Sequence, residues 1–413
     1  MSMRKKLFFI TDSYEANFSF IEYELSELSK SFDVSIISCS HTDKKITEDN
    51  VPIFNYYEPC YKLKKIFLLF LCAFDKVWRN EIKEILNENA KLGMIIGRIR
   101  ESTEFYLDAR MFSAFFRKKI CRETSEEAIV YSYWNVYYCL SYVLNKKYYP
   151  KFKLISRIHG YDLYNERRTA TLRQPFKSVM DNVASMVIFA AEMGKKYYLE
   201  HFAGKDYDKY VVCRIGAPRK YERQTDFGRG DVFNIVSCSN LIPLKRVHLI
   251  IEALSLVDGK KVSWVHFGDG FEEDNLKKLA DEKLSGKDNI SYKFMGRVCR
   301  DEIEKYYAEN NVNAFITTSE TEGLPVSIME AMGYGIPIIA TDVGGISEMI
   351  EDNGFLLPKD ISGKEVYEAL TKIIESTGED YLSLCNKSLE MWGKDYNAQN
   401  NAKALCERIC MLI

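Results

Sequence analysis

Several features are scarce in this sequence of 413 residues, and each absence argues against a class of protein. Proline occurs only 9 times, so long proline-rich linkers are not expected. The longest apolar run, residues 66–74, is far shorter than the roughly 20 residues that a membrane-spanning helix needs. The cysteines form no C-x-x-C pair, and no His/Cys cluster has the spacing of metal ligands. We therefore expect reduced thiols, a cytoplasmic protein without a leader peptide, and no metal or cofactor.

The composition is that of an ordinary globular protein, with 46 % hydrophobic and 28 % charged residues. At roughly 100–200 residues per domain, the length predicts two or three domains. Charge is unevenly distributed, because residues 1–217 contain 34 Lys and Arg against 27 Asp and Glu, whereas residues 218–413 contain 23 against 32. A basic half can attract an anionic membrane or substrate, but such a difference is also common between solvated surfaces. Both interpretations stay open.

Short apolar or β-branched runs alternate with longer segments of helical period, which is typical of an α/β protein with parallel sheets. Residues 1–217 and 231–390 each show this rhythm, so we expect two doubly wound, Rossmann-like domains. The polar, aperiodic residues 218–230 are the predicted linker, and residues 391–413 are predicted to form a C-terminal helix that returns to the first domain. Strands are expected at 6–11, 34–38, 129–132, 154–158, 186–189, 210–213, 233–237, 263–267, 290–294, 314–317 and 338–341.

Residues 60–122 interrupt the alternation with a long helical pattern. The segment begins with a basic, aromatic stretch at residues 61–79 and contains a second one at residues 112–119. Lysines beside an apolar run are compatible with a helix lying in a membrane interface. A helical insertion packed on the sheet of the first domain explains the pattern equally well. The membrane interpretation rests on Lys62, Lys64, Lys65, Phe67, Trp78 and Phe116.

The most specific stretch, residues 319–332, reads SETEGLPVSIMEAM and follows a predicted strand. Gly323 allows a turn, and Pro325 suits the first turn of a helix, where its missing N–H does no harm. The N–H groups of such a helix N-terminus suit an anion such as a diphosphate, and Ser327 can add a hydroxyl. Glu322 in the turn and Glu330 two helical turns later are acceptors for different parts of a hydroxyl-rich ligand.

These residues resemble family 4 of the retaining glycosyltransferases, within the glycosyl transferases group 1, whose signature is E-x7-E in the context E-G-L/F-P-x4-E-A-M. Residues 335–348 match the usual continuation of the motif, and the resemblance is nearly continuous over residues 233–358. It implies the two-domain GT-B fold, a nucleotide-sugar donor held by the C-terminal domain, and transfer with retention of anomeric configuration.

The resemblance also assigns roles within the C-terminal domain. Glu322 is expected to contact the donor sugar, and Glu330 the ribose hydroxyls. The backbone amides from Gly323 through Leu324 and Pro325 to Val326 are expected at the sugar and diphosphate. Arg297 and Val298 lie in the turn that reads the nucleobase, and Gly268 belongs to a G-x-G turn that is a weak signal by itself.

In the first domain, His159 opens an H-G-x-D sequence at a predicted strand end. A lone histidine is more often structural, but the resemblance places it near the reacting sugar. Tyr161 and Asp162 are expected on the acceptor side, as are Tyr14 and Asn17 in the loop after the first strand. That loop lacks the glycine-rich turn of many relatives, so the acceptor is not identified.

Relatives usually carry Arg and Lys five residues apart to hold the diphosphate, whereas this chain has Asn240 and Lys245. We expect the neighbouring Arg246 to take part of the missing role, because a guanidinium can bind phosphate bidentately. Asn240 would then supply a neutral hydrogen bond.

The sequence therefore predicts a retaining, metal-independent hexosyl-type glycosyltransferase. Its expected partners are a nucleoside-diphosphate sugar, a glycan or lipid-linked acceptor in polysaccharide biosynthesis, and an anionic surface at the inner face of a membrane, with no nucleic acid. Asp206 and Asp208 form a D-x-D pattern in a polar loop, which we interpret as chance. A same-fold epimerase or phosphorylase, or an inactive nucleotide-sugar-binding subunit, is the alternative.

Overall fold

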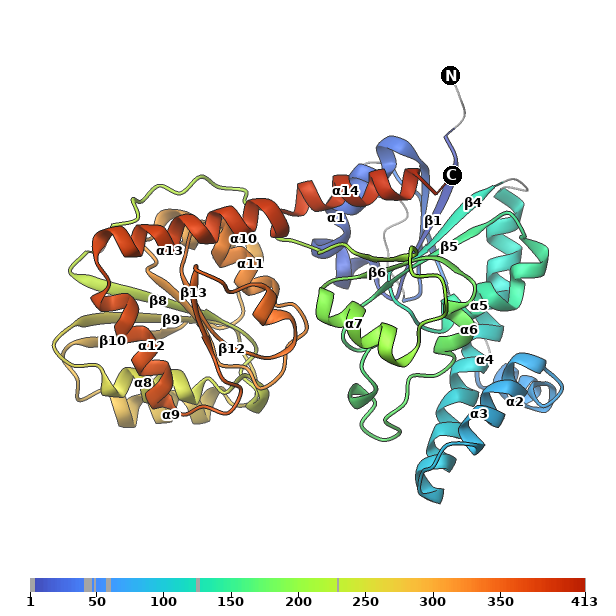
Figure 1. The fold of residues 1–413 in the computed structure, drawn as a ribbon, viewed down its shortest axis with the longest axis horizontal. Coiled ribbons are helices and arrows are strands. Elements are labelled where there is room, and N and C mark those ends of the chain that lie inside the picture. The colour runs from blue at the N-terminus through green and yellow to red at the C-terminus, as the bar shows by residue number, and fades with distance from the viewer. Residues whose placement is uncertain are drawn as a thin grey trace. The chain divides into compact units, whose positions relative to one another are not determined.

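The computed structural model describes residues 4–40, 47, 50–56, 61–123, 127–228 and 230–412. The chain divides into two compact units (Figure 1). Unit 1 comprises Met1–Cys213 and Ala402–Ile413, and unit 2 comprises Arg214–Asn401.

Unit 1 is built on a parallel sheet with the strand order β3-β2-β1-β4-β5-β6-β7. Leu7 and Phe9 of β1 enter one buried cluster, and Phe8 and Ile10 enter another. The strands are apolar on both faces because helices cover both sides of the sheet. The strands are β1 (Lys6–Thr11), β2 (Asp33–Ser38), β3 (Ile53–Asn55), β4 (Ala128–Ser132), β5 (Lys153–Ile158), β6 (Ala184–Phe189) and β7 (Tyr210–Val212).

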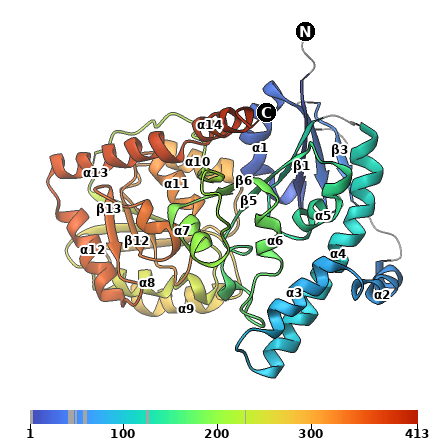
Figure 2. The same cartoon turned by 45° about the vertical axis from the view of Figure 1, so that its right-hand side comes forward.

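The helices of unit 1 divide between the two faces of this sheet. On one face, α1 (Tyr14–Ser31) lies beside α14 (Ala398–Cys410), as Figures 1 and 2 show. Leu405 and Ile409 of α14 are fully buried in the cluster that also contains residues of β1 and α1. The other face carries the second buried cluster, with residues of α4 (Leu92–Glu123) and α5 (Tyr137–Asn145). Two further helices of the unit are α6 (Lys177–Asp181) and α7 (Glu192–His201).

Residues 61–123 form three helices between β3 and β4, in agreement with the helical pattern of this segment. They are α2 (Tyr61–Cys72), α3 (Lys76–Leu86) and α4 (Leu92–Glu123). The Asp75 carboxylate caps α3 by accepting a 2.8 Å hydrogen bond from the Val77 N–H. Phe112 and Phe116 anchor α4 in the core of unit 1. In the described ranges, no helix combines the length and the apolar character required to cross a membrane.

Unit 2 contains a second parallel sheet, in the order β10-β9-β8-β11-β12-β13. The expected strands 233–237, 263–267, 290–294, 314–317 and 338–341 all lie within it. Its strands are β8 (Val232–Cys238), β9 (Lys261–Phe267), β10 (Ile290–Phe294), β11 (Ala314–Thr317), β12 (Ile338–Thr341) and β13 (Gly354–Leu357). Its α-helices are α8 (His248–Leu256), α9 (Glu273–Leu284), α10 (Arg300–Glu309), α11 (Val326–Gly333), α12 (Gly363–Glu375) and α13 (Gly378–Met391).

The segment expected as a linker is bonded to unit 2 in the structure. The Tyr221 hydroxyl donates to Asp301 at 2.8 Å, and the Arg223 guanidinium donates to the Tyr334 carbonyl at 2.6 Å. The boundary between the units lies after Cys213, earlier than the expected boundary at residue 217. Polar, aperiodic sequence indicated a linker, but these side chains find partners on helices far along the chain.

Both sheets share one topological feature that positions a ligand site. In each unit the chain first adds strands on one side of the first strand and then crosses to its other side. This reversal lies between β1 and β4 in unit 1, and between β8 and β11 in unit 2. Loops at such a reversal diverge at the carboxyl ends of the strands and leave room for a ligand. The fold-class prediction of two doubly wound α/β domains is therefore confirmed.

Candidate functional site

In unit 2, the loops that follow β8 and β11 are joined directly to each other. The Glu320 N–H donates to the Leu244 carbonyl at 2.8 Å. The Thr318 hydroxyl donates to the carbonyls of Lys245 and Arg246 at 3.1 and 2.9 Å. These bonds fix the relative position of two loops that lie far apart in the sequence.

Arg246 strengthens this connection. This residue adopts the left-handed conformation, with a φ of 47°, and ends the short 3₁₀ turn Pro243–Lys245. The guanidinium Nε donates to the Thr318 carbonyl at 2.7 Å, and Nη2 donates to the Ser319 carbonyl at 3.1 Å. The side chain expected at a diphosphate thus holds the backbone of the opposite loop.

Glu322 and Lys245, which the sequence predicts as site residues, meet at the end of this connection. The Lys245 ammonium lies 2.5 Å from Glu322 Oε1. The Ser319 hydroxyl donates to the same oxygen at 2.7 Å. Both charged side chains are mostly but not fully buried, so the carboxylate is oriented by two donors and still reaches solvent. Ser319 was not predicted as a site residue, although it opens the motif.

A pair of glycines after β12 supports the turn at Glu322. Gly344 has a φ of +60°, and a Cβ built on it would lie 2.2 Å from the Glu322 carbonyl oxygen. The Gly345 N–H donates to the Gly323 carbonyl at 2.7 Å. Only glycine allows this close approach at position 344, so the Glu322 turn requires glycine there.

The helix that follows this turn begins one residue later than expected. Pro325 is the N-cap of α11, with φ −72° and ψ 119°, rather than a residue of its first turn. A proline side chain has no hydrogen-bond acceptor, so Pro325 cannot cap the first N–H groups of the helix with its side chain. Gly323 is exposed, and Leu324, Val326 and Ser327 are half-buried beside it.

Glu330, the second acid of the motif, is 7 % exposed on α11. Its carboxylate pairs with the Arg300 guanidinium of α10 at 2.8 Å, and Glu304 lies 3.4 Å from the same Arg300 nitrogen. Burial raises the pKa of Glu330 to about 7; Arg300 opposes this shift and Glu304 adds to it. Arg300 was not predicted, because its link to Glu330 depends on the packing of α10 against α11.

Four of the predicted donor residues line one cavity of about 180 Å³ at the carboxyl ends of β8, β9 and β10. They are Asn240, Gly268, Arg297 and Val298, and the remaining lining residues are Cys238, Ser239, Phe267, Asp269 and Ile303. Gly268 has a φ of +130°, and its N–H donates to the Gly296 carbonyl at 2.8 Å. Arg297 pairs with Asp269 at 3.2 Å at the rim. The lining thus combines apolar side chains, such as those of Phe267, Val298 and Ile303, with this exposed ion pair.

In unit 1, His159 lies at the carboxyl end of β5 among aromatic rings. Its ring centroid is 4.3 Å from that of Trp134 and 4.9 Å from that of Tyr133. Burial lowers the pKa of His159 to about 3, and the charge on Arg157 adds to this effect. The neutral ring contacts the Tyr133 carbonyl through Nε2 at 3.0 Å, which requires that Nε2 donate.

The two residues expected beside His159 differ from each other. Asp162 is fully buried and accepts hydrogen bonds from the His159 N–H at 2.7 Å and the Asn135 N–H at 2.6 Å. Asp162 therefore fixes the backbone of the loop after β5 and is not exposed to an acceptor. Tyr161 is exposed, and the Arg168 guanidinium lies 4.5 Å from its ring centroid.

The other predicted acceptor-side residues lie at the start of α1. Tyr14 is 2 % exposed and packs in the core of unit 1, so its side chain does not line an open surface. Asn17 belongs to α1, and its side chain lies outside the described part of the structure. Asp206 and Asp208 are exposed in the loop before β7. Within the described ranges, no group of three or more His, Cys, Asp or Glu side chains is arranged to hold a metal.

Comparison with known proteins identifies the relatives of this architecture. Residues 221–392 match the family model Glycosyl transferases group 1. An uncharacterized glycosyltransferase of Haemophilus influenzae is 29 % identical over 170 residues, which are 40 % of this chain and 45 % of that protein. The O-antigen biosynthesis glycosyltransferase WbnH of Escherichia coli is 25 % identical over 348 residues, which are 80 % of this chain and 93 % of that protein.

The fold is shared with solved structures over nearly the whole chain. Anabaena Alr3699/HepE in complex with UDP and glucose superposes with a TM-score of 0.65 at 16 % identity, covering 99 % of this chain and 100 % of that one. At this identity the likeness concerns the fold alone. Taken together, the comparisons give the chain a GT-B fold, and residues 221–392 are similar to the glycosyl transferases group 1.

Proposed function

We propose that this protein is a retaining, metal-independent glycosyltransferase. It transfers a hexosyl-type sugar from a nucleoside-diphosphate sugar to a hydroxyl of a glycan or lipid-linked oligosaccharide in polysaccharide biosynthesis. The observation that carries the proposal is the cluster of Lys245, Ser319 and Glu322, next to the uncapped start of α11 and at the reversal point of the sheet. The names of the glycosyltransferase relatives and the UDP in the Alr3699/HepE structure support it.

The donor would lie along the carboxyl edge of the unit 2 sheet. Its base would enter the cavity of about 180 Å³, where Phe267 and Val298 offer apolar contact and Arg297 closes the rim. Glu330 would accept hydrogen bonds from the ribose hydroxyls. The diphosphate would meet the first N–H groups of α11 and the Lys245 ammonium. Lys245 has three N–H donors, so it can add a phosphate oxygen while it keeps Glu322.

Glu322 would accept hydrogen bonds from the hydroxyls of the donor sugar. Because Lys245 and Ser319 already orient its carboxylate, the side chain would not have to reorganise when the sugar binds. In the transfer step, the bond between the anomeric carbon and the β-phosphate oxygen breaks, and the acceptor oxygen bonds to the same face of that carbon. The acceptor proton passes to the leaving diphosphate, and Lys245 and the α11 N-terminus stabilise the charge that develops there. His159, neutral at pH 7, would contact the reacting sugar without adding a charge.

We also place the reaction in a reducing compartment, the cytoplasm. The cysteines whose side chains are described are all free thiols, and several of them, including Cys139 and Cys385, are fully buried. Structural disulfides are rare where thiols are kept reduced.

A donor screen tests the proposal. The protein is titrated calorimetrically with UDP-, GDP-, ADP- and CMP-sugars, and each donor that binds is then incubated with and without a glycan acceptor, in the presence of EDTA. We expect one nucleotide class to bind, and the sugar to reach the acceptor despite EDTA. Turnover that needs no acceptor would indicate an epimerase, release of sugar phosphate a phosphorylase, and binding without turnover an inactive subunit. Each of these three outcomes contradicts the proposal.

A further inference from the structure

One helix of unit 1 exposes an apolar face to solvent. On α2, the side chains of Leu63, Ile66 and Phe70 recur at helical spacing and are all strongly exposed, and Phe74 continues this face just after the helix end. We call these four residues the α2 patch. Phe70 is 74 % exposed and Phe74 is 82 % exposed, which is rare for phenylalanine in a folded domain.

The opposite face of the same helix is packed. Cys72 is buried in the core of unit 1, and Leu68 packs against that core. Lys65 pairs with Asp108 of α4 at 2.8 Å. Because α2 is held to α4 along this side, the α2 patch points away from the unit. In both views α2 lies at the side of the helical segment, next to α3 and α4 (Figures 1 and 2).

The charges of α2 indicate which partner fits. The helix sequence contains three lysines, at positions 62, 64 and 65, and no acidic residue. Lys64 is exposed beside the patch. A short helix with an exposed apolar face, a lysine beside that face and no acidic residue matches a helix that lies in the plane of a bilayer. In such a helix the apolar face enters the headgroup boundary and the cation meets anionic lipid.

We propose that the α2 patch docks unit 1 on an anionic lipid bilayer. The four apolar side chains enter the boundary between headgroups and acyl chains, and the exposed Lys64 meets the lipid phosphates. This inference deepens the proposed function, because it names the surface on which a lipid-linked acceptor is presented. In that respect the inference rests on the proposed function.

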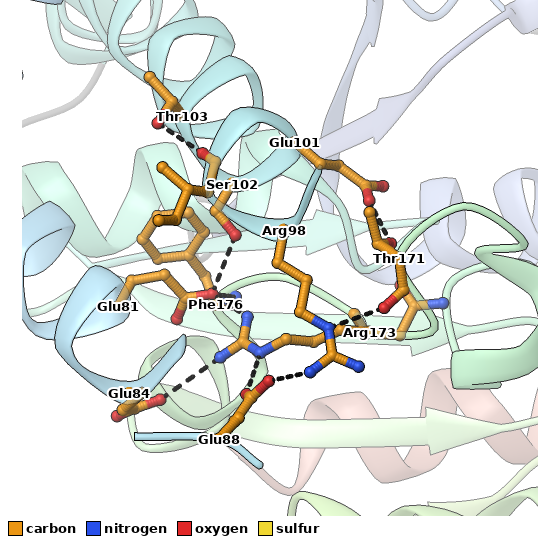
Figure 3. A network of polar contacts seen from close by, with 12 residues as sticks. Glu81, Glu84, Glu88, Arg98, Glu101, Ser102, Thr103, Thr171, Arg173 and Phe176 are labelled. Carbon is orange, nitrogen blue, oxygen red and sulfur yellow. Dashed lines mark hydrogen bonds and ion pairs between the residues drawn. The ribbon is translucent and has the colours of Figure 1, made fainter. Parts of the chain in front are cut away.

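A polar network joins this helical segment to the loop after His159 (Figure 3). Arg173 pairs with Glu81 and, at 2.7 Å, with Glu88, both on the α3 side of the network. Arg98 of α4 pairs with Glu88 and donates to the Thr171 carbonyl at 2.8 Å.

A second contact completes this link. Arg168 bonds Glu101 of α4 at 2.8 Å and the Tyr161 hydroxyl at 3.0 Å. Ion pairs that share several partners and are partly buried hold their elements more firmly than single exposed pairs do. Docking of α2 would therefore set the position of the Tyr161 loop relative to the bilayer.

Vesicle flotation with the full chain tests the proposal. One set of vesicles contains phosphatidylcholine alone, and the other contains added phosphatidylglycerol. Phe70→Glu is compared with Phe271→Glu, because Phe271 in unit 2 is also 74 % exposed and lies outside the α2 patch. We expect flotation with the anionic vesicles only, reversed by salt. Phe70→Glu should lower the partition coefficient at least about tenfold, and Phe271→Glu should leave it unchanged.

Three outcomes would overturn the proposal: no flotation with anionic vesicles, equal flotation with neutral vesicles, or equal loss in both variants. Light scattering of the same samples tests whether a second copy of the chain binds the α2 patch instead. A dimer that Phe70→Glu converts to a monomer would show that the patch is a self-association surface and would contradict the proposal. Calorimetric donor binding separates this proposal from the proposed function. Flotation by a protein that binds no nucleotide sugar would support the docking surface and contradict the transferase.

Discussion

The two sheets share the same reversal of strand order, yet the edges at that reversal carry different chemistry. In unit 2, the edge gathers charged side chains, with Lys245 beside Glu322 and Arg300 beside Glu330. In unit 1, the corresponding edge is lined by the rings of Tyr133, Trp134 and His159. The same topology therefore supports a charged site in one unit and an aromatic wall in the other.

Unit 1 does contain an ion pair near this edge, but it is placed inside the protein. Arg157 pairs with Glu24 and donates to the Tyr131 hydroxyl at 2.9 Å, and all three side chains are buried. A buried pair of this kind is costly to break, but it offers nothing to a ligand. The difference teaches that placement at a strand end does not by itself identify a binding residue, because a side chain at that position can be turned into the core.

The largest effect should follow from removing the charge of Glu322. Glu322→Gln keeps the shape but loses the carboxylate that Lys245 and Ser319 orient, so we expect kcat to fall by at least about 10²-fold with donor binding retained. Steady-state kinetics and calorimetry measure the two quantities. The matched control is Glu320→Gln, whose exposed side chain lies two residues away. Near-full activity in Glu322→Gln would contradict the role.

His159→Ala tests the aromatic edge of unit 1. We expect a loss of about 10²-fold in kcat, of the size seen when a polar contact to a transition state is removed. The pKa of about 3 predicts that wild-type activity shows no His159 titration between about pH 5 and about pH 8. Rate–pH profiles of the wild type and of His201→Ala, which changes an exposed histidine, provide the control. A wild-type step near pH 6.5 that disappears in His159→Ala would contradict the neutral state.

Arg246→Ala should have an intermediate effect. We expect weaker donor binding and slower transfer, equivalent to about 1.5–3 kcal/mol for a lost charged hydrogen bond. Asn240→Arg should then restore part of the loss if Arg246 contacts the diphosphate. A loss that Asn240→Arg does not restore would mean that Arg246 acts through the carbonyls of Thr318 and Ser319, and unchanged affinity and rate would exclude both roles. Titration calorimetry of the two variants and their combination measures this.

The smallest effect is expected at Glu330, which is remote from the reacting carbon in the proposed arrangement. Glu330→Ala should raise the donor Kd about tenfold and leave kcat nearly unchanged. Because the pKa of Glu330 is about 7, the carboxylate forms as pH rises through that value, and donor affinity should strengthen between about pH 6 and about pH 8. Calorimetry on Glu330→Gln, which cannot titrate, should show no such change; an equal pH dependence would contradict the assignment.

Much of this architecture could be predicted from the sequence, because buried parallel strands produce continuous apolar runs. The 6–11 and 263–267 strands are examples, and the residues 319–332 identified the turn that carries Glu322. Contacts between distant segments could not be predicted in this way. The left-handed turn at Arg246 directs its guanidinium to the opposite loop, and the packing of α10 brings Arg300 to Glu330.

Two local expectations failed for similar reasons. Tyr14 follows a strand end and carries a hydroxyl, both of which suggest a site residue, but the start of α1 turns it into the core. The backbone of Pro325 suits a helix start, but the helix begins one position later, so Pro325 precedes the helix and is not part of it. Sequence patterns state which positions can be functional, whereas burial decides which side chains are accessible.

The configuration of the first-formed product tests the central claim most directly. The reaction of an α-linked nucleotide sugar with its acceptor is followed by proton NMR from the first turnover, and the coupling constant of the anomeric proton reports the new linkage. The account predicts an α-linked product that needs Glu322 and forms in the presence of EDTA. A β-linked product at the earliest time points would contradict it.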